Sequence, residues 1–154
     1  MAGNTTTRAI DMLKRDGIIA HQTDTVYGLA CLPREKLLQR LTDIKHRHHK
    51  QGFILLTSQA SFLSEYIDCT AKEIDLLGQQ QPRPTTWLVN PKSNIAPALL
   101  GNTGKIAVRI TAHQTIKQIC EALGAIASTS ANISNLQTCS NASQIRRMFG
   151  PCVD

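Results

Sequence analysis

The sequence predicts an α/β domain with one open sheet. Short β-branched segments alternate along the chain with segments whose apolar residues recur at helical spacing. A length of 154 residues suits a single hydrophobic core. The composition, 42% apolar and 18% charged, can bury a substantial interior, and it excludes the class of intrinsically disordered chains.

The first third of the chain predicts a helix, a strand and a second helix. Apolar residues at helical spacing over 5–15, with Gly17 as a stop signal, predict the first helix. The run Ile18–Ala20 is short and β-branched, which predicts a strand. A second helical stripe over 33–44 starts at a proline, and the basic cluster 45–50 is expected to complete this helix at its negative dipole end.

The middle of the chain predicts three strands and one long helical segment. Phe53–Leu56 is an apolar run typical of a buried strand, and Ala60–Gln79 carries apolar residues at helical spacing. The segment Pro82–Pro84 breaks that helix. The β-branched segments Thr85–Val89 and Lys105–Thr111 predict two further strands.

The last third predicts a helix over 116–123 that ends at Gly124, and a strand over Ala125–Ser128. A segment of small polar residues, 129–135, follows this strand, and a final helix is expected over Ala142–Phe149. The closing residues look like the beginning of one more strand, so we expect a single domain, 1–154, that lacks a C-terminal strand and loop.

Net charge, hydropathy and cysteine content limit the kinds of partner and cellular location that we expect for this protein. Seventeen Lys and Arg against eleven Asp and Glu give a net charge of +6, which favours phosphate-bearing partners such as nucleotides or RNA. The sequence has no apolar run long enough to span a bilayer and no signal-peptide core, so we expect a soluble, cytoplasmic protein with no membrane contact. The five cysteines form no CxxC pair and are expected to be free thiols.

The basic segment Lys45–Lys50 is the most informative candidate site. Lys45, Arg47 and Lys50 are the residue types that neutralise a polyphosphate, although a solvated helix end would look the same. The interleaved histidines lack the i, i+4 spacing and acidic partners of a metal site, so no metal site is predicted from protein side chains.

Three further features are candidates. Thr23, Thr25 and Tyr27 lie in a hydroxyl-rich segment after a strand, where open α/β sheets bind ligands, but an ordinary turn explains them too. The small polar residues of 128–134 could meet phosphate or carboxylate oxygens, or simply cap a helix. Arg109 in an apolar strand needs a ligand or a partner. The sequence contains no P-loop and no G-x-G-x-x-G, so a nucleotide must be held in another way.

Taken together, these segments resemble the YrdC/TsaC family of threonylcarbamoyl-AMP synthases over nearly the whole chain. The residues that carry the resemblance are, in order, Thr23-Asp24-Thr25-Val26-Tyr27-Gly28-Leu29, Lys45-x-Arg47-x-x-Lys50, Pro84-x-Thr86, Ala107-Val108-Arg109 and Ser128-Thr129-Ser130-Ala131-Asn132-Ile133-Ser134. The chain departs from the family's pattern at Gln22 and His48, where the family has proline, and at Arg83, where it has glycine.

The resemblance implies an open twisted mixed sheet with a concave basic cavity. It also implies that L-threonine, bicarbonate and ATP, with Mg²⁺, give threonylcarbamoyl-AMP and pyrophosphate for a tRNA modification. Family analogy assigns a nucleotide and catalytic tetrad, made of Lys45, Arg47, Ser130 and Asn132. It assigns substrate binding to a second set, namely Thr23, Thr25, Tyr27, Lys50, Thr86, Arg109, Ser128 and Ser134.

The partners implied are ATP, L-threonine, bicarbonate, tRNA and other proteins of the same modification pathway. Two alternatives remain open at this point. One is a non-catalytic module that binds tRNA or double-stranded RNA through the basic face, and the other is a carbamoyl-transferring domain of the same fold. The net charge of +6 fits a synthase and an RNA-binding module equally well.

Overall fold

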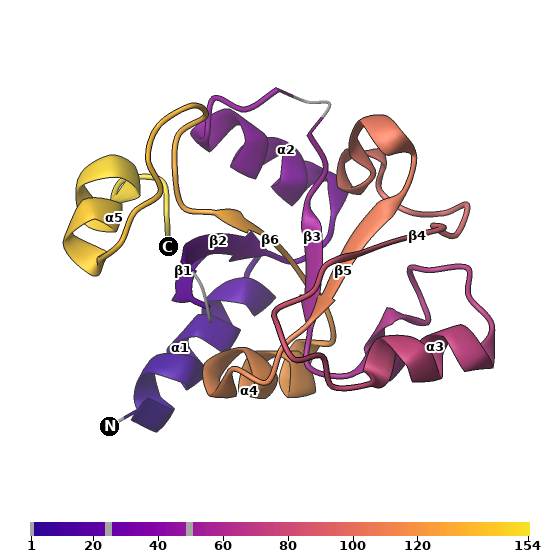
Figure 1. Ribbon diagram of the computed structural model, residues 1–154. Helices are drawn as coiled ribbons and strands as arrows, with labels where there is room; N and C mark the ends of the chain where they lie inside the picture. Colours follow the sequence, from indigo (N-terminus) through magenta and orange to yellow (C-terminus); the bar gives the residue numbers. More distant parts are fainter. Residues whose placement is uncertain (1, 24–25, 49–50) are drawn as a thin grey trace.

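The structure is a computed structural model that describes residues 2–23, 26–48 and 51–154 (Figure 1). The elements in chain order are α1 (Ala2–Lys14), β1 (Ile19–Gln22), β2 (Tyr27–Cys31), α2 (Glu35–Ile44), β3 (Ile54–Thr57), the 3₁₀ turn η1 (Ala60–Leu63), α3 (Ala71–Gly78), β4 (Trp87–Val89), the 3₁₀ turns η2 (Pro97–Leu99) and η3 (Gly101–Thr103), β5 (Ile106–Ile110), α4 (Gln114–Leu123), β6 (Ile126–Ser130) and α5 (Ala142–Phe149).

The six strands form one sheet in the order β1-β2-β6-β3-β5-β4. Among the described strand pairs, β3 and β5 are parallel and the other four pairs are antiparallel. The first and last strands of this order do not pair with each other, so the sheet is open. The predicted fold class, an α/β domain on an open mixed sheet, is therefore confirmed.

Helices cover the two faces of the sheet unequally. On one face, α1 and α4 pack together and bury an apolar cluster that includes Leu13, Ile19, Leu56, Ile116 and Ile126. The other face carries the larger core, to which α2, α3 and α5 all contribute buried side chains. Figure 1 shows α1 and α4 grouped at one end of the sheet, with α2 at the opposite end. This arrangement leaves part of the first face without a helix.

Two helix predictions are wrong. The basic segment 45–50 does not complete α2, which ends at Ile44. His46 takes a positive φ of 47°, an uncommon conformation for a residue with a side chain, and this turns the chain out of the helix. The segment Ala60–Gln79 is not one helix, because α3 has its own start at Thr70, whose side chain and backbone exchange hydrogen bonds with Glu73.

Strand boundaries also move two candidate site segments. β6 continues to Ser130, so Thr129 and Ser130, which were expected after the strand, lie within it. Thr86 precedes β4, which begins at Trp87. The predicted strand start near Val153 is not a strand in the structure, although the amide of Asp154 donates to the carbonyl of Ile18.

None of the helices in the described part of the chain has both the length and the apolar character needed to cross a bilayer.

Candidate active site

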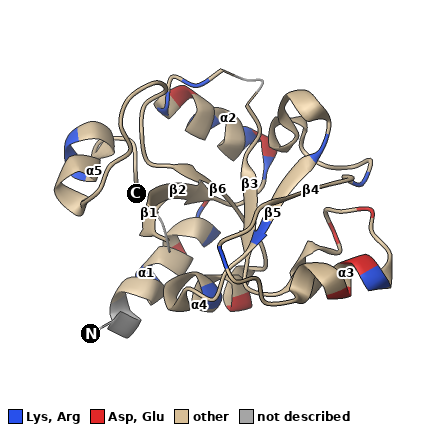
Figure 2. Ribbon diagram, in the orientation of Figure 1, with Lys and Arg blue, Asp and Glu red and all other residues tan. Residues whose placement is uncertain are grey.

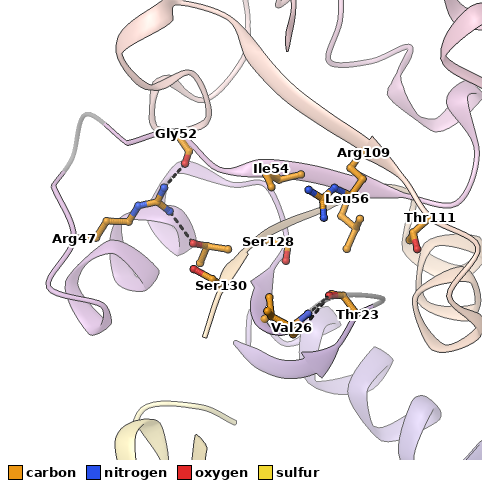
Figure 3. A pocket seen from close by; sticks show the side chains of 12 residues that line it. Thr23, Val26, Arg47, Gly52, Ile54, Leu56, Arg109, Thr111, Ser128 and Ser130 are labelled. Atoms are coloured by element: carbon orange, nitrogen blue, oxygen red, sulfur yellow. Dashed lines mark hydrogen bonds between the residues drawn. The ribbon is translucent and has the colours of Figure 1, made fainter. Parts of the chain in front are cut away.

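A cavity of about 350 Å³ opens on the part of the first face that no helix covers (Figure 3). Moving along three strands, the apolar residues beneath α1 and α4 give way to smaller or polar ones: Ile19 is followed on the same face by His21, Ala30 by Gly28, and Ile126 by Ser128. The lining residues are Thr23, Val26, Gly28, Arg47, Gly52, Ile54, Leu56, Arg109, Thr111, Ser128, Thr129 and Ser130.

Two guanidinium groups give this cavity its charge. Arg47 reaches it from the loop after α2, and Arg109 reaches it from β5 (Figure 3). No described acidic residue is among the lining residues. Other lysines and arginines are spread over the helices and loops of the molecule (Figure 2). The cavity therefore suits an anionic ligand.

Arg47 is held in place along its whole side chain. Its Nη2 donates to the carbonyl of Gly52 at 2.6 Å, its Nη1 to the hydroxyl of Thr129 at 3.0 Å, and its Nε to the side-chain oxygen of Gln51 at 3.0 Å. The guanidinium also lies over the ring of Phe53, 4.8 Å from its centroid. Burial lowers the pKa of Arg47. A fixed guanidinium of this kind offers its charge to a ligand without prior rearrangement.

Lys45 lies in the interior, not at the cavity. Its exposed fraction is 3%, and it is not among the lining residues. Its ammonium group donates to the carbonyl oxygens of Ser130 and Asn132 and, at 3.5 Å, to the amide oxygen of Asn132. Burial, followed by the nearby charge of Arg47, lowers the pKa of Lys45 to about 8. In this structure Lys45 ties α2 to the end of β6.

Lys45 holds Ser130, the last residue of β6, and Asn132, two residues after it. The hydroxyl of Ser130 donates to the amide oxygen of Asn132 at 2.6 Å, and only the serine is among the lining residues. The amide nitrogen of Asn132 donates to the carbonyls of Ile133 and Leu136. The tetrad expected from the resemblance is thus contiguous, with Arg47 and Ser130 at the cavity and Lys45 and Asn132 behind it.

Arg109 is oriented by a threonine from the neighbouring segment. Its Nε and Nη2 both donate to the hydroxyl of Thr86, at 2.9 and 2.7 Å. Thr86 itself is not among the lining residues, so it acts on the cavity through Arg109. Within the described residues, Nη1 of Arg109 has no hydrogen-bond partner, which leaves its two N–H groups available to a ligand.

The remaining substrate-binding candidates fall into three groups. Thr23 lines the cavity after β1, and its hydroxyl donates to the carbonyl of Val26 and accepts from the amide of Val26. Ser128 lines the cavity from β6. Tyr27 and Ser134 are not among the lining residues: Tyr27 packs against the larger core on the opposite face of the sheet. Thr25 and Lys50 lie outside the described residues, as does part of the histidine cluster.

Reasoning from the sequence missed His21. It is 5% exposed, and its Nε2 lies 3.0 Å from the hydroxyl of Ser128 at the cavity wall. The available signal was the alternation of β1, which places His21 on the same face as Gly28. Burial lowers the pKa of His21 to about 4, so its imidazole is neutral at physiological pH.

The described lining residues do not form a Mg²⁺ site of their own. They supply hydroxyls and guanidinium groups, whereas Mg²⁺ prefers carboxylate oxygens, and no described group of three His, Cys, Asp or Glu residues could hold a metal.

Comparison with known proteins places the chain in a family. The family model Sua5/YciO/YrdC, described as "Telomere recombination", matches residues 11–154. Threonylcarbamoyl-AMP synthases of Aliivibrio fischeri and Histophilus somni are each 36% identical to this chain, over 148 and 149 residues. These alignments cover 93% and 94% of this chain and 80% and 81% of the two relatives.

A solved structure shares the fold. The crystal structure of P. abyssi Sua5 complexed with L-threonine superimposes with a TM-score of 0.86 at 23% sequence identity, covering 97% of this chain and 45% of that one. The family match spans the strands that carry Arg109 and Ser128 and the loop that carries Arg47. The chain belongs to the Sua5/YciO/YrdC family.

Proposed function

We propose that this protein is a threonylcarbamoyl-AMP synthase whose reaction takes place in the cavity on the sheet face. The observation that carries the proposal is the pairing of Arg47 and Arg109 in one cavity of about 350 Å³, in a chain 36% identical to proteins of that name. Two separated guanidinium groups suit two substrates with anionic groups, the triphosphate of a nucleoside triphosphate and the carboxylate of an amino acid.

The proposed reaction needs positioning and charge neutralisation, with no covalent intermediate on the protein. The amino group of L-threonine and bicarbonate give a carbamate and water. A carbamate oxygen then attacks the α-phosphorus of ATP, and the bond from that phosphorus to the bridging oxygen breaks to release pyrophosphate. Fixed cations that match charge developing on the phosphates are the main source of rate in such a transfer.

The two arginines divide the substrates between them. Arg47, locked by Gly52 and Thr129, faces the triphosphate of ATP, with the hydroxyl of Ser130 beside it. Arg109, oriented by Thr86, binds the carboxylate of threonine. Mg²⁺ enters as the counterion of ATP. The cavity residues Thr23 and Ser128 complete the amino acid site. Lys45 and Asn132 support Ser130, on the nucleotide side, from behind.

Pyrophosphate release measured with purified protein tests the proposal. We expect release from ATP and Mg²⁺ only when L-threonine and bicarbonate are both present, and L-serine serves as a matched control amino acid that lacks the methyl group. Pyrophosphate release that continues unchanged when either threonine or bicarbonate is left out would refute the assignment as a synthase. Binding of double-stranded RNA by a protein without turnover would favour the non-catalytic module instead.

Delivery of the product to tRNA and contact with other proteins of the modification pathway are part of the same proposal, supported by the charge of +6 and the names of the relatives. A cytoplasmic location stays a prediction from the sequence.

A further inference from the structure

His21 and Ser128 form a buried pair at the wall of the cavity. His21 lies on β1 and Ser128 on β6, with β2 between them. Their exposed fractions are 5% and 7%, and Nε2 of the imidazole lies 3.0 Å from Oγ of the serine. The serine lines the cavity, whereas the histidine stands behind it. A ligand in the cavity would therefore meet the serine hydroxyl first.

Gly28 is what allows this contact across a strand. It is the cross-strand partner of His21 and lies on the same face as Ser128. A Cβ atom at position 28 would come within 2.8 Å of Nε2 of His21 and within 3.2 Å of Oγ of Ser128. Because glycine has no side chain, the imidazole ring lies over the backbone of β2 and reaches the serine.

The hydrogen bonds of the ring fix the direction of the pair. Nδ1 of His21 lies 3.3 Å from the carbonyl oxygen of Gln22, which can only accept a hydrogen bond, so Nδ1 carries the proton. Burial keeps the ring neutral, and the nearby charge of His113 acts in the same direction. In a neutral ring protonated at Nδ1, Nε2 is an acceptor. The hydroxyl of Ser128 must then donate its hydrogen to His21.

This direction decides what Ser128 can bind. With its hydrogen committed to His21, Oγ presents only lone pairs to the cavity. Phosphate and carboxylate oxygens carry no hydrogen at neutral pH, so they gain nothing from such an atom. An N–H group of a ligand, in contrast, can donate a hydrogen bond to Oγ. The sequence alone had suggested the reverse, that hydroxyls in this segment donate to phosphate or carboxylate oxygens.

We propose that Ser128 Oγ is a fixed hydrogen-bond acceptor for the nitrogen of the amino acid substrate, and that His21 is the positioning residue that fixes it. The inference rests on the proposed function. Arg109 lies on the same sheet face, two strands away through β3, and strand spacing puts its Cα about 12 Å from that of Ser128. With its carboxylate at Arg109 and its nitrogen at Ser128, the amino acid would lie over β3 on this face of the sheet.

Single and double variants test the pair. We expect His21→Phe and Ser128→Ala each to raise the KM for L-threonine about tenfold, the loss of one hydrogen bond to a charged group, with the KM for ATP unchanged. Since the histidine acts through the serine, the double variant should be no worse than Ser128→Ala alone. Multiplying effects in the double variant, or an unchanged threonine KM in both single variants, would overturn the proposal.

Thr42→Ala is the matched control. Thr42 is 4% exposed, and its hydroxyl donates to the carbonyl of Leu38 within α2, away from the cavity. This substitution removes a buried side-chain hydrogen bond as Ser128→Ala does, but the threonine KM should stay at the wild-type value. A tenfold rise in this control would show that loss of stability alone explains the variants.

Nitrogen NMR of the wild-type protein gives a test that needs no variant to fold. We expect the ring nitrogens of His21 to show a proton on Nδ1 and none on Nε2 at pH 7, and a proton on Nε2 would overturn the inference. A wild-type protein without threonine-dependent turnover would refute the proposed function instead. The ring tautomer can still be measured in that case, so the two failures are distinguishable.

Discussion

Acid should destabilise the fold through His21. Its pKa is about 4 in the folded protein, against an ordinary value of 6.5, because burial penalises the charged imidazole. Between those two pH values the unfolded chain holds a proton on this ring and the folded protein does not. The free energy of unfolding therefore falls as pH drops from 6.5 to 4, and linkage gives a loss of about 2 kcal/mol between pH 7 and pH 5.

Urea unfolding at pH 7, 6 and 5 measures this loss. His21→Phe removes the titrating group, so the variant should lose about 2 kcal/mol less than the wild type over the same interval. Subtraction of the two series cancels the contribution of the carboxylates. Thr42→Ala, which removes a buried hydrogen bond but no titrating group, is the control and should keep the wild-type dependence on pH. Equal slopes for the wild type and His21→Phe would refute the assignment of a buried neutral imidazole.

Three further predictions concern residues around the cavity. Lys45→Met should lower the free energy of unfolding by about 2 to 4 kcal/mol, because it leaves the buried carbonyls that Lys45 holds without a donor. Lys36→Met, at an exposed position of α2, should change the free energy of unfolding little. Equal melting temperatures for the two variants would show that Lys45 has no such role. Arg47→Lys should weaken ATP binding about tenfold or more in a direct titration, since the fork to two fixed partners is lost although the charge remains; wild-type affinity would contradict the nucleotide assignment. Thr86→Val should raise the KM for threonine several-fold at unchanged kcat, with Thr86→Ser restoring it, and a lowered kcat at unchanged KM would be inconsistent with orientation of Arg109.

Elements with clear start and stop signals could be predicted well from the sequence. The last helix was expected over Ala142–Phe149 and is found there, where the side chain of Asn141 accepts from the amide of Gln144 at its first turn. The helix before it ends at Leu123, ahead of Gly124 with its positive φ. These boundaries depend on local hydrogen bonding and backbone conformation, which residue types at adjacent positions report.

The basic segment shows where such reasoning ends. Lys45 and Arg47 are both basic and lie two positions apart in the chain. Lys45 is nevertheless buried in the interior, whereas Arg47 lines the cavity. The difference comes from the turn at His46, whose positive φ could not be predicted from the residue types at these positions. Their partners, at the end of β6, lie more than 80 positions away in the chain. Local pattern carries no information about such contacts.

His21 was missed for a related reason. A single histidine in a short strand does not by itself indicate a functional site. The role of His21 depends on its contact with Ser128, 107 positions later in the chain, and on the absence of a side chain at Gly28 between them. Strand order and register put these residues together, and neither can be read from one strand. The motifs that led to the family were those in which several functional residues are adjacent.

Carbon-labelled bicarbonate tests the central claim most directly. The protein, incubated with ATP, Mg²⁺, L-threonine and labelled bicarbonate, should form an adenylate that contains the label and the mass of threonine, as detected by mass spectrometry. The variant Arg109→Met, which removes a guanidinium from the cavity, should form little of it at the same threonine concentration. A product without the label, or full labelling in the variant, would contradict a synthase that works in this cavity.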